Sequence, residues 1–127
     1  MFLQLNHQRL EVFKLSQKFV LECYKLTKIF PADEKFAMVQ QIRRAALSVH
    51  LNVAEGCSRK SLAERKRFFE ISRGSIIEID AAPDIASALG YCYQEKLMDL
   101  GHYMLDCFKM LSSLIQKDTA PYIHIHY

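Results

Sequence analysis

Residues that interrupt regular structure are scarce in this sequence, which holds four glycines and three prolines among its 127 residues. An all-β fold needs a turn after each short strand, and such turns draw heavily on glycine and proline. The scarcity therefore predicts long helices with few connections. Half of the residues are hydrophobic and 24% are charged, a balance typical of a globular protein with a buried core. At this length the chain should form a single domain, 1–127.

Apolar residues recur at spacings of three and four, which predicts amphipathic helices over residues 6–29, 32–55, 61–89 and 94–117. The stripe of the first helix consists of Val12, Leu15, Phe19, Cys23, Leu26 and Phe30. Because each connection spans only a few residues, consecutive helices should be antiparallel neighbours. The predicted fold is all-α, an up-down antiparallel four-helix bundle.

A few residues set the expected helix ends. Pro31 should stop the first helix at the preceding residue and serve as the first residue of the second. Gly56 should end the second helix as a left-handed cap. Ser61 and Glu64 should form a capping box at the start of the third helix.

The last residues, A-P-Y-I-H-I-H-Y, change period at Pro121 and predict a short extended C-terminal arm over 120–127. His124 and His126 form an H-x-H pair in this arm, but a solvated or subunit-packed tail is the favoured interpretation. A di-iron bundle would need E-x-x-H on two helices, and no E-x-x-H occurs. We therefore predict no metal and no other cofactor.

The sequence contains no apolar run long enough for a membrane span and no early apolar segment typical of a signal peptide. We therefore expect a cytoplasmic protein without a membrane partner. Its four cysteines form no C-x-x-C pair and should be free thiols or small core residues. They are Cys23, Cys57, Cys92 and Cys107.

Charge is unevenly distributed along the chain. Residues 35–73 hold nine basic and three acidic side chains, whereas residues 74–127 hold three basic and seven acidic ones. A chain with this polarity can bind a polyanion with one region, or bind copies of itself by placing basic and acidic surfaces together.

The densest basic stretch gives the candidate nucleic-acid-binding residues, which are Arg59, Lys60, Lys66, Arg67 and Arg73. The functional interpretation is contact with phosphates, which requires clustered cations but no exact spacing. The alternative is a solvated helix face whose cations pair with Glu64 and Glu70 at helical spacing. No RNP signature, zinc-finger spacing or helix-turn-helix pattern accompanies the stretch.

A second set of polar residues lies within apolar helical segments and comprises Arg43, Arg44, Asn52, Glu55 and Glu78. A partly buried carboxylate needs a partner, and an arginine can supply two parallel hydrogen bonds. We favour a structural polar network that fixes helix register over catalysis, because no nucleophile with an adjacent base is evident. If Glu55 or Glu78 is buried beside an arginine, its replacement by alanine should cost about 3–5 kcal/mol. The chain is not predicted to be an enzyme.

Several stretches together resemble a known family. They are F-P-A-D-E (30–34), Q-I-R-R-A-A-L-S-V (40–49), N-V-A-E-G (52–56), F-F-E-I-S-R-G-S (68–75) and L-G-Y (89–91). They are similar to the bacterial four-helix bundle proteins encoded in intervening sequences of large-subunit ribosomal RNA genes. Those proteins are in turn similar to the accessory variability protein of diversity-generating retroelements.

The resemblance implies a ring of bundles, typically a homopentamer, with no known catalytic activity. It also implies a basic surface for RNA or DNA and, in the retroelement branch, a reverse-transcriptase partner. Pro83 departs from the family pattern, because a mid-helix proline costs about 3 kcal/mol unless it is accommodated as a kink. The leading hypothesis is a non-enzymatic, ring-forming bundle that binds nucleic acid through its basic surface. The alternative is an assembly or adaptor protein that binds a protein partner without direct nucleic-acid contact.

Overall fold

The computed structural model describes the backbone of residues 7–124 and the side chains of residues 9–116. Over this range the chain forms five α-helices and one 3-10 turn. The elements are α1 (His7–Thr27), η1 (Ala32–Glu34), α2 (Met38–Ser58), α3 (Leu62–Asp80), α4 (Ala82–Ala88) and α5 (Gln94–His124). No strand occurs within the described backbone.

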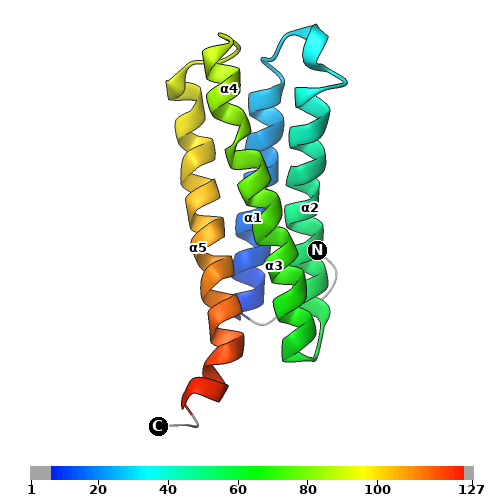
Figure 1. The fold of residues 1–127 in the computed structure, drawn as a ribbon, viewed down its shortest axis with the longest axis vertical. Helices are drawn as coiled ribbons and strands as arrows, with labels where there is room; N and C mark the ends of the chain where they lie inside the picture. Colours follow the sequence, from blue (N-terminus) through cyan, green and yellow to red (C-terminus); the bar gives the residue numbers. More distant parts are fainter. Residues whose placement is uncertain (1–6, 125–127) are drawn as a thin grey trace.

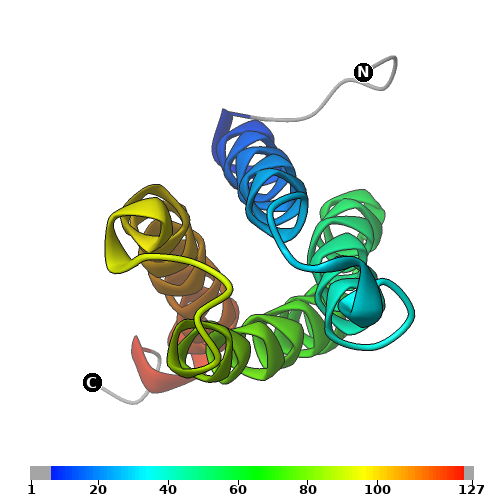
Figure 2. The same ribbon diagram turned by 90° about the horizontal axis from the view of Figure 1, so that it is seen from above.

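The helices confirm the predicted all-α, up-down four-helix bundle. Figure 1 shows α1, α2, α3 and α5 side by side along the long axis, with the short α4 continuing the line of α3. Seen from above, α1, α2, α3 and α5 stand around a central space (Figure 2), and the buried side chains of the core lie between them. Each long helix packs against its two neighbours, in the cyclic order α1, α2, α3 and α5.

The core is built from one stripe of each long helix. On α1 the fully buried apolar residues are Val12, Phe19 and Cys23, which belong to the stripe expected from the spacing. They meet Val49 and Val53 of α2, together with the buried faces of the other helices. Those faces supply Phe69, Ile76 and Ile79 from α3 and Leu100, Cys107 and Leu111 from α5. All four cysteines are free and buried, as predicted.

The second helix begins later than expected. Pro31 precedes the 3-10 turn η1 instead of opening the helix, and α2 begins only at Met38. The backbone at Ala37 has φ −121° and ψ −101°, which no helix adopts. Buried Phe30 anchors this connection by packing against the Tyr91 ring, with 5.6 Å between the ring centres.

Gly56 does not end the second helix, which continues to Ser58. Among the described residues only Gly90 has a positive φ, so Gly56 is no left-handed cap. Its role is to make room, because a Cβ at this position would lie 2.6 Å from Cε1 of Phe69. The glycine therefore permits close packing of α2 against α3, and the expected end at residue 55 was wrong for that reason.

The expected third helix, 61–89, is divided at Ala81 into α3 and α4. Pro83 lies in the first turn of α4, where the missing N–H would have no partner within the helix in any case. The break thus removes the penalty expected for a mid-helix proline. At the other end of α3, Ser61 caps the helix by accepting a hydrogen bond from the Glu64 N–H, which confirms that half of the predicted box.

The expected extended arm was wrong over residues 120–124, because α5 runs through Pro121 to His124. A proline removes one backbone hydrogen bond, and a helix can accommodate that loss as a kink. Residues 125–127, with the rest of the predicted arm, lie outside the described part of the chain.

Candidate functional site

The turn between α2 and α3 gathers the basic residues at one end of the bundle, opposite η1 and α4 (Figure 1). One arginine organises this turn. The Arg65 Nη1 donates to the carbonyl oxygens of Arg59, at 3.0 Å, and Lys60, at 2.7 Å. These bonds satisfy carbonyls left over where α2 ends, and they hold the turn against the first turn of α3. Sequence alone does not single out Arg65, because nothing local distinguishes it from its basic neighbours.

Arg59 is drawn back against the helices instead of projecting into solvent. Its Nη2 lies 2.9 Å from Oε2 of Glu55, and its guanidinium lies 5.1 Å from the centre of the Phe68 ring. A longer approach of 4.0 Å joins its Nε to a carboxylate oxygen of Glu64. Two carboxylates therefore share the charge of Arg59, which leaves it poorly placed to neutralise a phosphate.

Of the other four predicted cations, Arg73 and Lys66 pair with other side chains, whereas Lys60 and Arg67 pair with none of those described. Arg73 packs toward α5, where Nη1 donates to Oγ of Ser112 at 3.1 Å and the guanidinium lies 5.9 Å from the Phe108 ring centre. Lys66 approaches Glu70 at 3.9 Å. The remaining pair, Lys60 and Arg67, is exposed, and neither side chain has an ion-pair or hydrogen-bond partner among the described side chains.

The predicted polar network is not a single network. Arg43 joins α2 to α1, donating from Nε to Oγ1 of Thr27 at 2.8 Å with its guanidinium 4.6 Å from the Tyr24 ring centre. Asn52 bonds within α2, donating from Nδ2 to the carbonyl oxygen of Ser48 at 2.8 Å and to its Oγ at 3.1 Å. These two sets of contacts lie on opposite sides of α2 and share no residue, so they are separate.

The carboxylates of that set lie at the surface. Glu55 pairs with Arg59, and its side chain is 52% exposed. Glu78 is exposed and accepts a hydrogen bond from Nε2 of Gln41. Arg44 is exposed, with no partner among the side chains of 9–116. The condition for a costly buried carboxylate is therefore not met for Glu55 or Glu78.

Large apolar side chains remain exposed on α2 and α3, the two helices that carry most of the resemblance. Leu47 and Leu51 of α2 are 41% and 59% exposed, and Ile71 of α3 is 43% exposed. The nearby Gly74 adds no side chain, and a Cβ there would meet open space. We call these exposed residues of α2 and α3, Leu47, Leu51, Ile71 and Gly74, the outer face; the Ser75–Ser48 hydrogen bond joins the two helices near them. A surface of this kind is typical of an association site.

A serine and a histidine meet between α1 and α2, although the sequence suggested no nucleophile beside a base. Oγ of Ser16 lies 2.7 Å from Nδ1 of His50, and the His50 ring packs 4.5 Å from the Phe13 ring, centre to centre. Burial lowers the pKa of His50. Ser16 is completely buried and also bonds to the Phe13 carbonyl, so its hydroxyl is inaccessible to a substrate. The pair is an interhelical hydrogen bond that sequence spacing cannot reveal.

The buried thiols are poorly suited to nucleophilic or metal chemistry. Burial raises the pKa of Cys23 and of Cys107 to about 12, and that of Cys57 to about 11. A thiol with so high a pKa stays protonated near neutral pH. Among the described residues no three histidine, cysteine or acidic side chains are grouped to hold a metal ion. No described helix is long and apolar enough to cross a membrane.

Comparison with known proteins identifies relatives of this fold. A family model described as 23S rRNA-intervening sequence protein matches residues 8–113. A crystal structure of a protein of unknown function from Bacteroides thetaiotaomicron, assigned to the S23 ribosomal protein family, superposes with a TM-score of 0.77. The two sequences are 22% identical, and the match covers 86% of this chain and 98% of that one. A comparison with curated proteins gave no match.

Proposed function

The chain belongs to the 23S rRNA-intervening sequence protein family, and on that premise we propose that it is a non-catalytic assembly protein that binds nucleic acid. In this proposal identical subunits associate into a ring through the outer face. The basic α2–α3 turn of each subunit then contacts phosphates of RNA or DNA.

The observation that carries this proposal is the pair of unpartnered cations at the turn. Lys60 and Arg67 are exposed, while Arg65 is committed to backbone carbonyls that fix the turn's shape. Cations without carboxylate partners are the groups that can release counterions from a nucleic acid at the lowest cost. Lys66 can join them, because its approach to Glu70 is long and both side chains are solvent-accessible.

A ring would multiply this small patch. Two or three phosphate contacts in one subunit give weak binding, but symmetry would repeat them around one rim. Contacts on one polyanion then act together, so that the overall affinity exceeds that of one subunit without any new interaction.

The test is a double variant, Lys60→Gln with Arg67→Gln, measured for binding of generic RNA and DNA over a range of salt concentrations. The matched control is Lys28→Gln with Lys35→Gln, which removes two exposed lysines at the opposite end of the bundle. We expect the turn variant to bind both nucleic acids more weakly, with a salt slope lower by about two units per subunit engaged. The control should change neither quantity by a comparable amount.

The same experiment distinguishes this proposal from the alternative. In that alternative the chain is an adaptor that binds a protein, such as a reverse transcriptase, and makes no direct contact with nucleic acid. The observation favouring the adaptor is that Arg59 and Arg73 are engaged with Glu55 and Ser112. If both double variants bind nucleic acid as tightly as the parent protein, or if both lose the same amount of affinity, no phosphate site exists at the turn. The adaptor would then take first place.

A further inference from the structure

A groove opens at the end of the bundle opposite the basic turn. It has a volume of about 560 Å³ and lies between the α3–α4 junction and the first turns of α5. Its lining comprises Asp80, Pro83, Asp84, Gln94, Glu95, Leu97, Met98, Leu100, Gly101 and Met104. The end of α3 and the first turn of α4 form one side of the groove through Asp80, Pro83 and Asp84.

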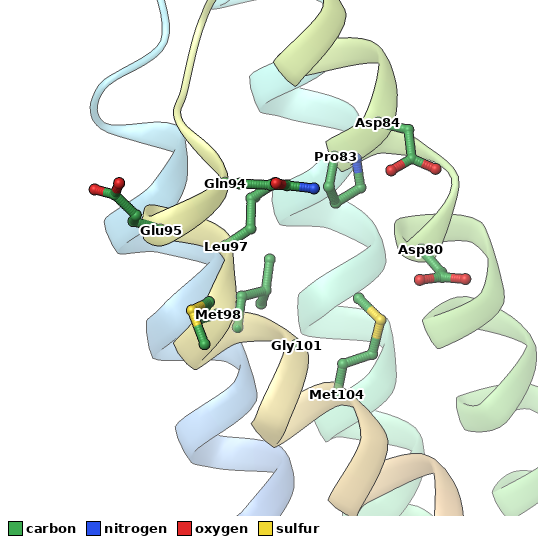
Figure 3. Close-up of a pocket in the computed structure, with 10 residues that line it drawn as sticks. Asp80, Pro83, Asp84, Gln94, Glu95, Leu97, Met98, Gly101 and Met104 are labelled. Atoms are coloured by element: carbon green, nitrogen blue, oxygen red, sulfur yellow. The ribbon is translucent and has the colours of Figure 1, made fainter.

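The floor of the groove is apolar and its edges are acidic. Figure 3 shows Leu97 and Met104 between the carboxylates, with Asp80 and Asp84 on the α3–α4 side and Glu95 on the other. Met98 beside them is 61% exposed. Methionine adapts its shape to a partner, which makes it frequent at surfaces that bind peptides. Gly101 leaves further room, because a Cβ there would meet nothing within 4 Å.

The charged side chains that line the groove are all acidic. Asp80, Asp84 and Glu95 are exposed and have no ion pair or hydrogen bond among the described side chains, and no lysine or arginine lines the groove. Glu95 offsets the partial positive charge at the N-terminus of α5, whereas Asp80 lies at the C-terminal end of α3, where the backbone carbonyls add negative potential. The groove therefore repels phosphates and attracts cations.

We propose that this groove is the docking site for a basic, amphipathic helical segment of a protein partner. Arginine and lysine fit such a site, because their aliphatic stems can lie on the Leu97 and Met98 surface while their charged groups reach the acidic edges. A leucine or similar residue one turn away would fill the space beside Gly101. A bare metal ion is a poor fit, since the carboxylates are not grouped closely enough to bind one.

A second copy of this chain is the less suitable occupant. Arg59 and Arg65 of its basic turn are engaged with Glu55 and backbone carbonyls, so only Lys60, Arg67 and the loosely paired Lys66 could reach the acidic edges. Docking that turn would also compete with the nucleic-acid contact assigned to it above. The partner segment is therefore inferred to be separate from this chain.

The experiment measures fluorescence anisotropy of a labelled helical peptide that carries arginine and leucine on one face. One control peptide has serine for each leucine, and another has glutamine for each arginine. We expect the first peptide to bind at least about ten times more tightly than either control, because both the floor and the edges of the groove are needed. Equal binding of the serine peptide would overturn the proposal by showing attraction to surface charge alone.

Variants of the protein test whether the peptide binds in the groove. Asp80→Asn with Asp84→Asn should weaken binding about tenfold, whereas Asp33→Asn with Asp106→Asn, which removes the same charge outside the groove, should leave it within about twofold. Gly101→Leu should block binding while retaining every carboxylate, because the new side chain enters open space in the groove. Unchanged peptide affinity in Gly101→Leu protein with the parent circular dichroism spectrum would refute the site.

A competition experiment identifies the occupant. Unlabelled Gly101→Leu protein, which keeps the basic turn but has a blocked groove, should not displace the peptide from the parent protein at micromolar concentration. Displacement by Gly101→Leu protein, but not by Gly101→Leu protein that also carries Lys60→Gln and Arg67→Gln, would assign the groove to a second copy instead of a partner and would overturn the proposal. The groove variants should not change nucleic-acid binding, so the proposal for the groove and the proposal for the basic turn can be refuted independently.

Discussion

At the scale of single residues, the buried Ser16–His50 contact makes stability depend on pH. Because burial lowers the pKa of His50, the folded protein keeps this ring neutral while the unfolded chain takes up a proton. The stabilisation that follows from this difference in the pKa of His50 is fully present above the ordinary pKa of 6.5. It is lost as the pH falls from there toward the lower folded-state pKa. We expect the free energy of unfolding, measured by denaturant titration, to fall over this interval.

Two histidine variants check this assignment. His50→Gln should flatten the dependence on pH, whereas His102→Gln, which changes an exposed residue of α5, should leave it as in the parent protein. If the parent protein and His50→Gln lose stability in parallel between pH 6.5 and the folded-state pKa, another group is responsible.

The polar residues show what sequence spacing can and cannot reveal at this scale. Residue type suggested that Arg43 and Asn52 serve structure, and both make interhelical or intrahelical hydrogen bonds. Spacing could not reveal that Glu55 and Glu78 are exposed, because exposure depends on how far α2 and α3 rotate toward the core. An exposed pair such as Glu55–Arg59 contributes less than about 1 kcal/mol, far below the cost expected for a buried charge.

At the scale of the elements, Gly56 controls how closely α2 approaches α3. We expect Gly56→Ala to lower the free energy of unfolding by about 1–3 kcal/mol, because the added methyl group overlaps the Phe69 ring, which is 2% exposed and cannot move into solvent. Gly101→Ala is the matched control, since its methyl group enters open space and alanine favours a helix by about 0.8–1 kcal/mol. Equal stability of the two variants in thermal melts would contradict this account.

The existence of the helices could be predicted, but their ends could not. Periodicity locates α1, α2, α3 and α5 because each must bury one stripe, and that requirement is written in the spacing of apolar residues. The ends depend on contacts that are distant in sequence. Gly56 lies within α2 against the Phe69 ring, and the connection that precedes α2 contains Phe30, which packs on Tyr91. Pro83 predicts a break or a kink in the helix, and α3 indeed ends before it while α4 begins with this proline in its first turn.

At the scale of the whole molecule, the outer face predicts self-association. Leu51→Glu should convert the assembly to smaller species, because a charge would be buried at the contact, and sedimentation velocity at micromolar concentration would detect the change. Leu105→Glu on α5 is the control, since Leu105 is 57% exposed and Leu51 59%. A parent protein that sediments as a monomer, or a Leu51→Glu protein that still assembles, would remove the ring from the proposal.

The candidate site was predictable as a segment but not as a surface. The sequence located the basic stretch, yet which cations face solvent depends on partners supplied by other turns and helices, such as Ser112 for Arg73. The sequence showed only that residues 74–127 are acidic; the groove itself was not predictable, because its carboxylates come from α3, α4 and α5 and meet only after the chain has folded.

The acidic groove and the basic turn lie at opposite ends of a long bundle, so each subunit has an electric dipole along its axis. Parallel subunits standing side by side in a ring would have these dipoles aligned, and aligned neighbours repel one another. Apolar contact at the outer face would have to exceed that repulsion. Salt screens it over a distance of about 10 Å at 0.1 M. A higher ionic strength would therefore favour association of the subunits into a ring. It would at the same time weaken the binding of that ring to a nucleic acid.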